Sequence, residues 1–220
     1  MTASNKTKRK KNNRRRRKTR IRPWVWGACA FLAALLIIIP ILMEFRPDMV
    51  PLYEDVAYPR TYSEYVEKYA QEYGVEENLV YAVIKTESGF QPDAVSENNA
   101  KGLMQITEET FDWISWKLGE SGQYVHDDLY DPELCIRYGT YFLGYLIDEF
   151  DGYTEVLAAY HAGRSAVNDW LGNPEYSSDG VTLDYIPYDD TAHYVTKVLN
   201  NYSKYTQIYR EENQQTGQSQ

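Results

Sequence analysis

The stretch YAVIKTESGF, residues 81–90, places an acid where an apolar helical stripe should continue. On a period of 3.6 residues, Glu87 shares one helical face with three apolar residues, Val80, Val83 and Ile84. The Ser-Gly pair that follows predicts the end of the helix. The Glu87 carboxylate is therefore expected at the C-terminal tip of a core-facing stripe, where the low dielectric and the negative helix end raise its pKa. The competing interpretation is an exposed glutamate in a fraying last turn.

The net charge of −9 hides two unlike parts of the chain. Residues 1–22 hold 12 Lys and Arg, and no acid precedes Glu44, so the remainder carries 11 basic and 32 acidic residues, a net of 11 − 32 = −21. Between the two parts lies WVWGACAFLAALLIIIPILM, residues 24–43, without a charge. As a helix it would be about 30 Å long, one hydrocarbon thickness. The pattern predicts a transmembrane helix over 23–43, a basic cytoplasmic segment over 1–22, and everything later outside the cell membrane.

Three other interpretations of the N-terminal region compete with an uncleaved anchor. A cleaved signal peptide needs small residues after the apolar run, whereas ILMEFRP at 41–47 is bulky and charged. Cys29 opens the apolar run instead of closing it, unlike a lipid-attachment cysteine. The basic run at 6–20 would in isolation suit nucleic acid, but beside a span it predicts contact with anionic lipid heads and no nucleic-acid partner.

The rest of the chain divides into a spacer, one globular domain and a tail. Its prolines predict a linker over 44–59, and the polar run EENQQTGQSQ predicts a disordered tail over 211–220. Residues 60–210 are enough for one core, and Cys135 is expected in it as a small buried hydrophobe. Helical patterns cover 61–74, 77–88, 107–119, 131–150, 153–163 and 189–205. No alternating β-branched run competes, so the fold class is mainly α.

Four short motifs follow one another in the domain: ESGF at 87–90, GLMQIT at 102–107, AAYHAG at 158–163 and IPYDDTAHYVTKVL at 186–199. With 18 residues from Glu87 to Gln105, this order resembles the bacterial soluble-lytic-transglycosylase (SLT) domain over roughly residues 60–205. The resemblance implies a lysozyme-like fold of the goose-type class, as a single domain behind the membrane helix. It also implies a lytic transglycosylase that cuts peptidoglycan glycan strands and needs no cofactor.

Glu87 matches the catalytic acid of that family. The resemblance implies that it protonates the β-1,4 glycosidic oxygen between N-acetylmuramic acid and N-acetylglucosamine, which requires a carboxyl group still protonated near neutral pH. The same carboxylate would then take the proton of the sugar's C6 hydroxyl and give a 1,6-anhydro end without water. Ordinary glycosidases use two carboxylates, and the sequence has no second acid in an equally clear motif.

Three residues of the central loop are substrate-binding candidates. The Gln105 amide suits an N-acetyl or hydroxyl group, or alternatively bonds to nearby backbone. Thr107 falls where family members often have a methionine lining the sugar site, or alternatively caps the next helix. Ser96 is either a polar contact or a turn residue.

The two C-terminal motifs supply the other candidates. The resemblance places Ala159, Tyr160 and His161 at the substrate and directs the Tyr160 hydroxyl toward the catalytic carboxylate. His161 stands where the family has asparagine, and a neutral hydrogen-bonding substitute is the favoured interpretation over a pH-sensitive group. Asp190 falls where glutamate is usual, beside Ala192 in place of arginine. Tyr194 keeps the motif's tyrosine, with core packing as its alternative.

The sequence shows no metal-ligand cluster, because its three histidines lack the required spacing. Expected partners are glycan strands, the cytoplasmic membrane, and machinery for wall synthesis or secretion. Two other functions remain open: a hydrolytic muramidase of the same fold, and a peptidoglycan-binding module without turnover. The second is motivated by the departures at His161, Asp190 and Ala192.

Overall fold

The computed structural model describes residues 34, 38, 39 and 56–217, with side chains of the last helix described to residue 210. The chain divides into two compact units, Met1–Leu52 and Tyr53–Gln220. The basic segment predicted over 1–22 lies outside the described residues, as does the membrane helix predicted over 23–43 apart from three positions. Within the described part, no helix combines the length and apolar character that crossing a membrane requires.

The second unit is helical in all the residues for which structure is described, apart from loops and two isolated β-bridges. The helices are α3 Ser63–Tyr73, α4 Glu77–Glu87, α5 Glu108–Leu118, α6 Pro132–Glu149, α7 Tyr153–Ala162, α8 Arg164–Leu171 and α9 Asp189–Gly217, with the 3₁₀-helix η1 His126–Tyr130 before α6. The mainly α class is confirmed, and each of the six expected helices is present. Asp131 caps α6 by accepting from the Leu134 N–H at 2.9 Å, with Pro132 at the first helical position.

Two helices were absent from the sequence prediction. Gly163 ends α7 as expected, but the chain enters α8 directly afterwards, and only Val167 and Trp170 of α8 are buried. Two apolar residues one turn apart give too short a periodic signal to identify a helix of this length. The single turn of η1 is shorter still.

The ends of the domain also differ from the predicted boundaries. Helix α9 continues to Gly217, through most of the segment whose composition predicts a disordered tail. Glu and Gln propagate an existing helix well, although such a polar segment would not nucleate one. At the other end, the last residues of the expected linker contact α9: Tyr209 donates to the Tyr58 carbonyl at 2.8 Å, and Tyr205 to that of Pro59 at 3.0 Å.

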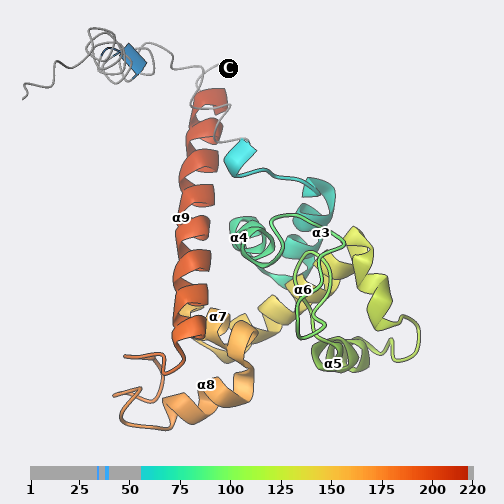
Figure 1. Ribbon diagram of the computed structural model, residues 1–220, viewed down its shortest axis with the longest axis vertical. Helices are drawn as coiled ribbons and strands as arrows, with labels where there is room; N and C mark the ends of the chain where they lie inside the picture. Colours follow the sequence, from blue (N-terminus) through green and yellow to red (C-terminus); the bar gives the residue numbers. More distant parts are fainter. Residues whose placement is uncertain (1–33, 35–37, 40–55, 218–220) are drawn as a thin grey trace, which may run out of the picture. The chain divides into compact units, whose positions relative to one another are not determined.

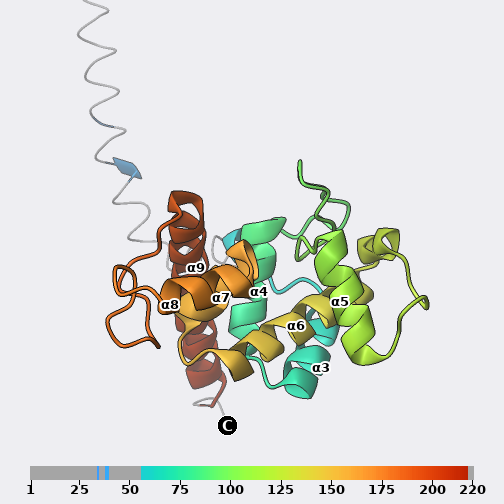
Figure 2. The same cartoon turned by 90° about the horizontal axis from the view of Figure 1, so that it is seen from below.

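Helix α4 is the centre of the core. Six consecutive residues, from Leu79 to Ile84, are fully buried, so the helix is enclosed on every side and not only along one stripe. Figure 1 shows it between the long α9 and the pair α5 and α6, and Figure 2 shows α7 and α8 crossing in front of α9. Because α4 is held so completely, its C-terminal residue Glu87 has a fixed position.

The loop between α4 and α5 folds back over the end of α4. Its turns are joined by the bridges Val95–Lys101 and Lys101–Ile106. At Gly102 the backbone has φ +75°, and a Cβ would collide with the Leu129 carbonyl oxygen and lie 2.8 Å from the Cys135 sulfur. Gly102 therefore allows close contact with η1 and α6. Cys135 is fully buried, as predicted.

Candidate active site

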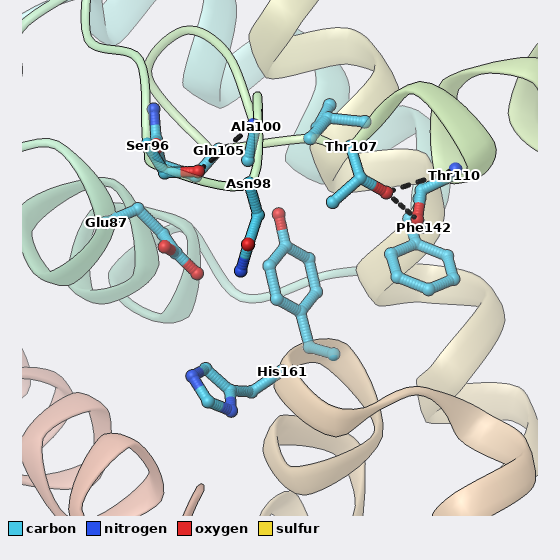
Figure 3. Close-up of a pocket in the computed structure, with 11 residues that line it drawn as sticks. Glu87, Ser96, Asn98, Ala100, Gln105, Thr107, Thr110, Phe142 and His161 are labelled. Atoms are coloured by element: carbon cyan, nitrogen blue, oxygen red, sulfur yellow. Dashed lines mark hydrogen bonds between the residues drawn. The ribbon is translucent and has the colours of Figure 1, made fainter. Parts of the chain in front are cut away.

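A cavity of about 250 Å³ opens where the end of α4, the α4–α5 loop, α6 and the end of α7 meet. Figure 3 shows the side chains that surround it. Six of the residues singled out in the sequence line it: Glu87, Ser96, Gln105, Thr107, Tyr160 and His161. These six residues come from three segments that are separate in the sequence, namely the end of α4, the α4–α5 loop and α7, and the fold brings them together.

Glu87 lies at the C-terminal end of α4 and is partly exposed, in the wall of this cavity. Burial raises its pKa from 4.5 to about 7, while the hydrogen bond from Tyr194 and the charge of Lys197 lower it and only partly offset the effect of burial. The interpretation as an exposed, fraying glutamate is wrong. The next residue fixes the helix end, because the Ser88 hydroxyl donates to the carbonyl oxygens of Ile84 at 3.2 Å and of Leu103 at 2.9 Å.

Tyr194, and not Tyr160, holds the Glu87 carboxylate. Its hydroxyl donates to Glu87 Oε1 at 2.7 Å, and the residue is 8% exposed. The Tyr160 hydroxyl instead donates to the Met104 carbonyl oxygen at 2.8 Å, which corrects the expected direction of that side chain. The reason is tertiary: the α4–α5 loop brings the Met104 carbonyl group, which needs a donor, to the Tyr160 hydroxyl. Tyr160 still lines the cavity with its ring.

The Gln105 side chain both stabilises the loop and faces the cavity. Its amide nitrogen donates to the carbonyl oxygens of Ala94 at 3.1 Å and of Gly102 at 2.9 Å, as the backbone-bonded alternative predicted. Its φ of +49° lies in the left-handed region, which costs a non-glycine residue about 1–2 kcal/mol. Because both amide hydrogens are used, Oε1 is the atom left to accept from a ligand in the cavity.

Ser96 and Thr107 shape the loop and line the cavity as well. Ser96 Oγ accepts from the Ala100 N–H at 3.1 Å. Thr107 caps α5 by accepting from the Thr110 N–H at 3.3 Å, and its hydroxyl donates to Thr110 Oγ1 at 3.0 Å. The capping alternative for Thr107 is therefore correct, and it is compatible with a place in the cavity wall.

The remaining predicted residues are arranged around Tyr194. The His161 ring stacks on the Tyr194 ring with centroids 4.5 Å apart, and Nδ1 is 3.1 Å from Thr191 Oγ1. Burial lowers the pKa of His161, and the charge of Asp190 only partly offsets this, so the ring is neutral at pH 7. That agrees with a neutral substitute for asparagine.

Three candidates are absent from the cavity wall: Tyr194, which reaches the site through its bond to Glu87, and also Asp190 and Ala159. Asp190 is exposed, absent from the cavity wall, and accepts from the Thr191 N–H at 2.9 Å. Ala159 is fully buried in the core of the domain. Ala159 lies on α7 with His161, and Asp190 directly precedes Thr191, which contacts His161. Ala159 and Asp190 therefore lie near the site without contacting the cavity themselves.

Asn98 and Phe142 also line the cavity, although no sequence motif singles them out. In Figure 3 the Asn98 amide projects toward the Glu87 carboxylate, and both residues line the cavity. Phe142, on α6, lies with its ring centroid 5.4 Å from that of Tyr160. Nothing in the letters SENNAKG distinguishes Asn98 from Asn99, because the turn geometry decides which side chain points inward. Phe142 also packs against the hydrophobic core, as expected of an aromatic residue on a buried helix face.

Glu87 is the one carboxylate among the residues that line the cavity. Within the residues whose structure is described, no group of three or more His, Cys, Asp and Glu side chains is arranged to hold a metal ion. The arrangement therefore offers one acid of raised pKa, one hydroxyl that orients it, and amide groups that can hold polar substituents of a ligand.

This helical fold around a single half-buried glutamate is that of the lysozyme-like transglycosylases. The chain belongs to the transglycosylase SLT domain family, whose match covers residues 64–180, more than half of the chain. The expected family is confirmed.

Relatives and solved structures agree with this membership. Membrane-bound lytic murein transglycosylase C of Yersinia pestis (strain Pestoides F) is 40% identical over 111 residues, which are 46% of this chain and 31% of the relative. The 70-kDa soluble lytic transglycosylase of Escherichia coli matches with a TM-score of 0.62 and 27% identity, over 69% of this chain and 25% of that one. Lytic transglycosylase Slt of Pseudomonas aeruginosa, solved as an inactive mutant, matches with a TM-score of 0.59 and 28% identity, over 71% and 25%. This chain thus matches about a third of the length of its curated relatives.

Proposed function

We propose that the protein is a peptidoglycan lytic transglycosylase that cleaves the β-1,4 bond between N-acetylmuramic acid and N-acetylglucosamine, with Glu87 as general acid and then general base. The observation that carries the proposal is the Glu87 carboxyl group itself: half-buried, with a pKa of about 7, and in a cavity without another acid. A group with this pKa is protonated and ionised in similar proportions at neutral pH, so it can give a proton and take one back.

The reaction proceeds in two proton transfers. Glu87 donates its proton to the glycosidic oxygen as the C1–O bond breaks, and the N-acetylglucosamine side leaves as an alcohol. The ionised Glu87 then accepts the proton of the C6 hydroxyl of the muramic acid, whose oxygen bonds to C1. The 1,6-anhydro ring forms, no water is consumed, and the protonated Glu87 is restored.

A single carboxylate favours this outcome over hydrolysis. Hydrolysing glycosidases pair two carboxyl groups about 5–9.5 Å apart, the second serving as a nucleophile or as the base that activates water. The exposed Asp190 is outside the cavity wall and accepts from its own neighbour's N–H. With no second acid to activate water, the internal C6 hydroxyl is the nucleophile that the site accommodates best.

The other lining residues are assigned to the substrate and to Glu87. Gln105 Oε1 and the Asn98 amide are placed to accept from, and donate to, N-acetyl and hydroxyl groups. Tyr194 orients Glu87 and, by stabilising its ionised form, keeps its pKa from rising further. The hydroxyl groups of Ser96 and Thr107 stabilise the loop in the shape that forms the cavity wall.

The proposal includes a place in the cell. A single span over 23–43, with its N-terminus in the cytoplasm and the domain on the outer face, is supported by the basic segment and the uncharged run. The relative from Yersinia pestis is described as membrane-bound, which agrees with this placement. Protease applied to intact spheroplasts should then remove the domain and leave the N-terminal segment protected.

The test is a product analysis with the full-length protein on purified peptidoglycan. Mass spectrometry should find muropeptides with 1,6-anhydro ends, each one water lighter than the hydrolysis product. Glu87→Gln should release none, because only the transferable proton is lost, while pelleting with the glycan is retained.

Glu64→Gln is the matched control, since Glu64 is exposed on α3, away from the cavity. Reducing ends instead of anhydro ends would identify a muramidase. Binding without any product from the wild type would identify a binding module.

A further inference from the structure

One face of α5 leads away from the cavity and ends in a cluster of rings around a lysine. Thr107 and Thr110 line the cavity, and Trp113 and Lys117 follow at intervals of three and four residues on the same face. At about 1.5 Å per residue, Lys117 lies roughly 10 Å further along the helix than Thr110. We call Trp113, Trp116, Lys117 and Tyr145 the aromatic–lysine surface.

This surface is continuous with the cavity through Phe142. The Phe142 ring lines the cavity, and its centroid is 5.7 Å from that of Trp113 in an edge-to-face contact. Trp113 in turn meets Tyr145 at 4.7 Å, again edge to face. The rings of α5 and α6 therefore form one uninterrupted wall that runs from the cavity to Lys117.

Within the part of the chain that the structure describes, Lys117 has no ion pair, unlike most of the other cations. Its ammonium lies 5.4, 5.3 and 5.2 Å from the ring centroids of Trp113, Trp116 and Tyr145. Among the described residues, the five ion pairs engage other cations, namely Arg60, Lys68, Lys101, Arg137 and Arg164. The rings position the Lys117 ammonium, and its N–H donors stay available.

We propose that the aromatic–lysine surface binds the carboxylate of a peptide stem, carried by a muramic acid unit of the strand that lies beyond the cleavage site. The inference rests on the proposed function, since it assumes a peptidoglycan strand in the cavity. Charge complementarity supports it: an acidic domain places an unpaired cation beside its cavity, where an anionic substrate passes.

The same geometry favours a stem over a sugar ring at this position. A sugar needs an open aromatic face to stack on, whereas the ammonium already lies over the faces of all three rings. Trp116 is 65% exposed, so it offers apolar surface to the aliphatic part of a peptide at the edge of the groove. The surface therefore presents charge flanked by apolar rings, which matches a carboxylate on a short alkyl chain.

The test compares two substrates for the full-length protein: strands that retain their peptide stems, and strands from which an amidase has removed them. The readout is the ratio of kcat/KM for strands that retain their stems to kcat/KM for stem-free strands. Lys117→Gln should lower this ratio about two- to fivefold, the range of an exposed ion pair, and Lys117→Arg should restore it. The wild-type ratio should fall toward the Lys117→Gln value as salt is added. Lys204→Gln is the matched control, because Lys204 is exposed on α9 and donates to Gln207 Oε1 at 3.4 Å.

Each result decides between defined alternatives. An unchanged ratio in Lys117→Gln, or a wild type without preference for stems, overturns the inference and leaves the proposed function intact. An equal loss on both substrates would assign the contact to the glycan chain that both share, and a loss on the stem-free strand alone would assign it to the lactyl carboxylate that the amidase exposes; either result contradicts a stem site. Failure of the wild type to cleave either substrate would overturn the proposed function, and this inference with it.

Discussion

Replacing Tyr194 with phenylalanine removes one hydroxyl group from the site and leaves its ring. That hydroxyl donates to Glu87 Oε1 at 2.7 Å, and this bond lowers the Glu87 pKa because it favours the ionised carboxylate. The Tyr194 ring stacks on His161 with centroids 4.5 Å apart, and phenylalanine keeps this contact. The substitution therefore changes the electrostatics of Glu87 and little else.

The expected change in the Glu87 pKa follows from how much more the hydrogen bond stabilises the ionised form of Glu87 than the protonated form. A hydrogen bond to a charged group contributes about 1.5–3 kcal/mol, and one between neutral groups about 0.5–1.5 kcal/mol. The ionised form therefore loses about 1–1.5 kcal/mol more than the protonated form does. Since one pKa unit corresponds to about 1.4 kcal/mol, the Glu87 pKa should rise by about one unit from its value of about 7.

The assay is the pH dependence of kcat/KM for release of anhydro-muropeptides. The alkaline limb reports loss of the acid form in the free enzyme, so in Tyr194→Phe it should move up by about one pH unit, whatever happens to the absolute rate. Tyr202→Phe is the matched control: this hydroxyl, also on α9, donates to Glu76 at 2.7 Å, a carboxylate outside the cavity wall. An alkaline limb that stays in place in Tyr194→Phe, or moves to lower pH, would refute the reasoning.

Three further changes test the site and the fold around it. Because burial raises the Glu87 pKa above its unfolded value of 4.5, the stability contributed by the protonated form is present below pH 4.5 and is lost as pH rises through 7. Glu87→Gln should therefore gain up to about 3 kcal/mol over the wild type between pH 4 and pH 8 in denaturant titrations, and an equal difference at both pH values would contradict this. Gly102→Ala should cost about 3 kcal/mol or more in thermal unfolding, since its Cβ meets a backbone carbonyl, whereas Gly119→Ala, at φ +72° in open space, should cost only about 1 kcal/mol. Asn98→Ala should raise KM about fivefold, because one hydrogen bond to the substrate is lost, whereas Glu97→Ala at the exposed neighbouring position should leave KM unchanged. Equal KM values in the two variants would show that Asn98 does not contact the substrate.

The helices and the acid were predictable because both depend on local patterns. Periodicity and caps identified α4 and α6, and the position of Glu87 at the end of a buried helix followed from the same periodicity. The motif order identified the family, and with it most of the residues that line the cavity.

The direction of side chains in the loop and on neighbouring helices was not predictable. Whether Tyr160 or Tyr194 reaches Glu87 depends on where the Met104 carbonyl lies, and that is set by the tertiary path of the α4–α5 loop. The Asn98 side chain points into the cavity because of the geometry of its turn, which the amino-acid type at this position does not determine. Helix α8 was not predicted because its two buried residues give too short a periodic pattern. In the folded domain, packing against α7 stabilises this helix.

The most direct measurement is the titration of the Glu87 carboxyl group, followed by ¹³C NMR on protein labelled at glutamate and assigned by its absence in Glu87→Gln. The account predicts a midpoint near pH 7 for this one glutamate. A midpoint near 4.5, the value of an ordinary exposed glutamate, would leave no proton to donate at neutral pH and would contradict the account.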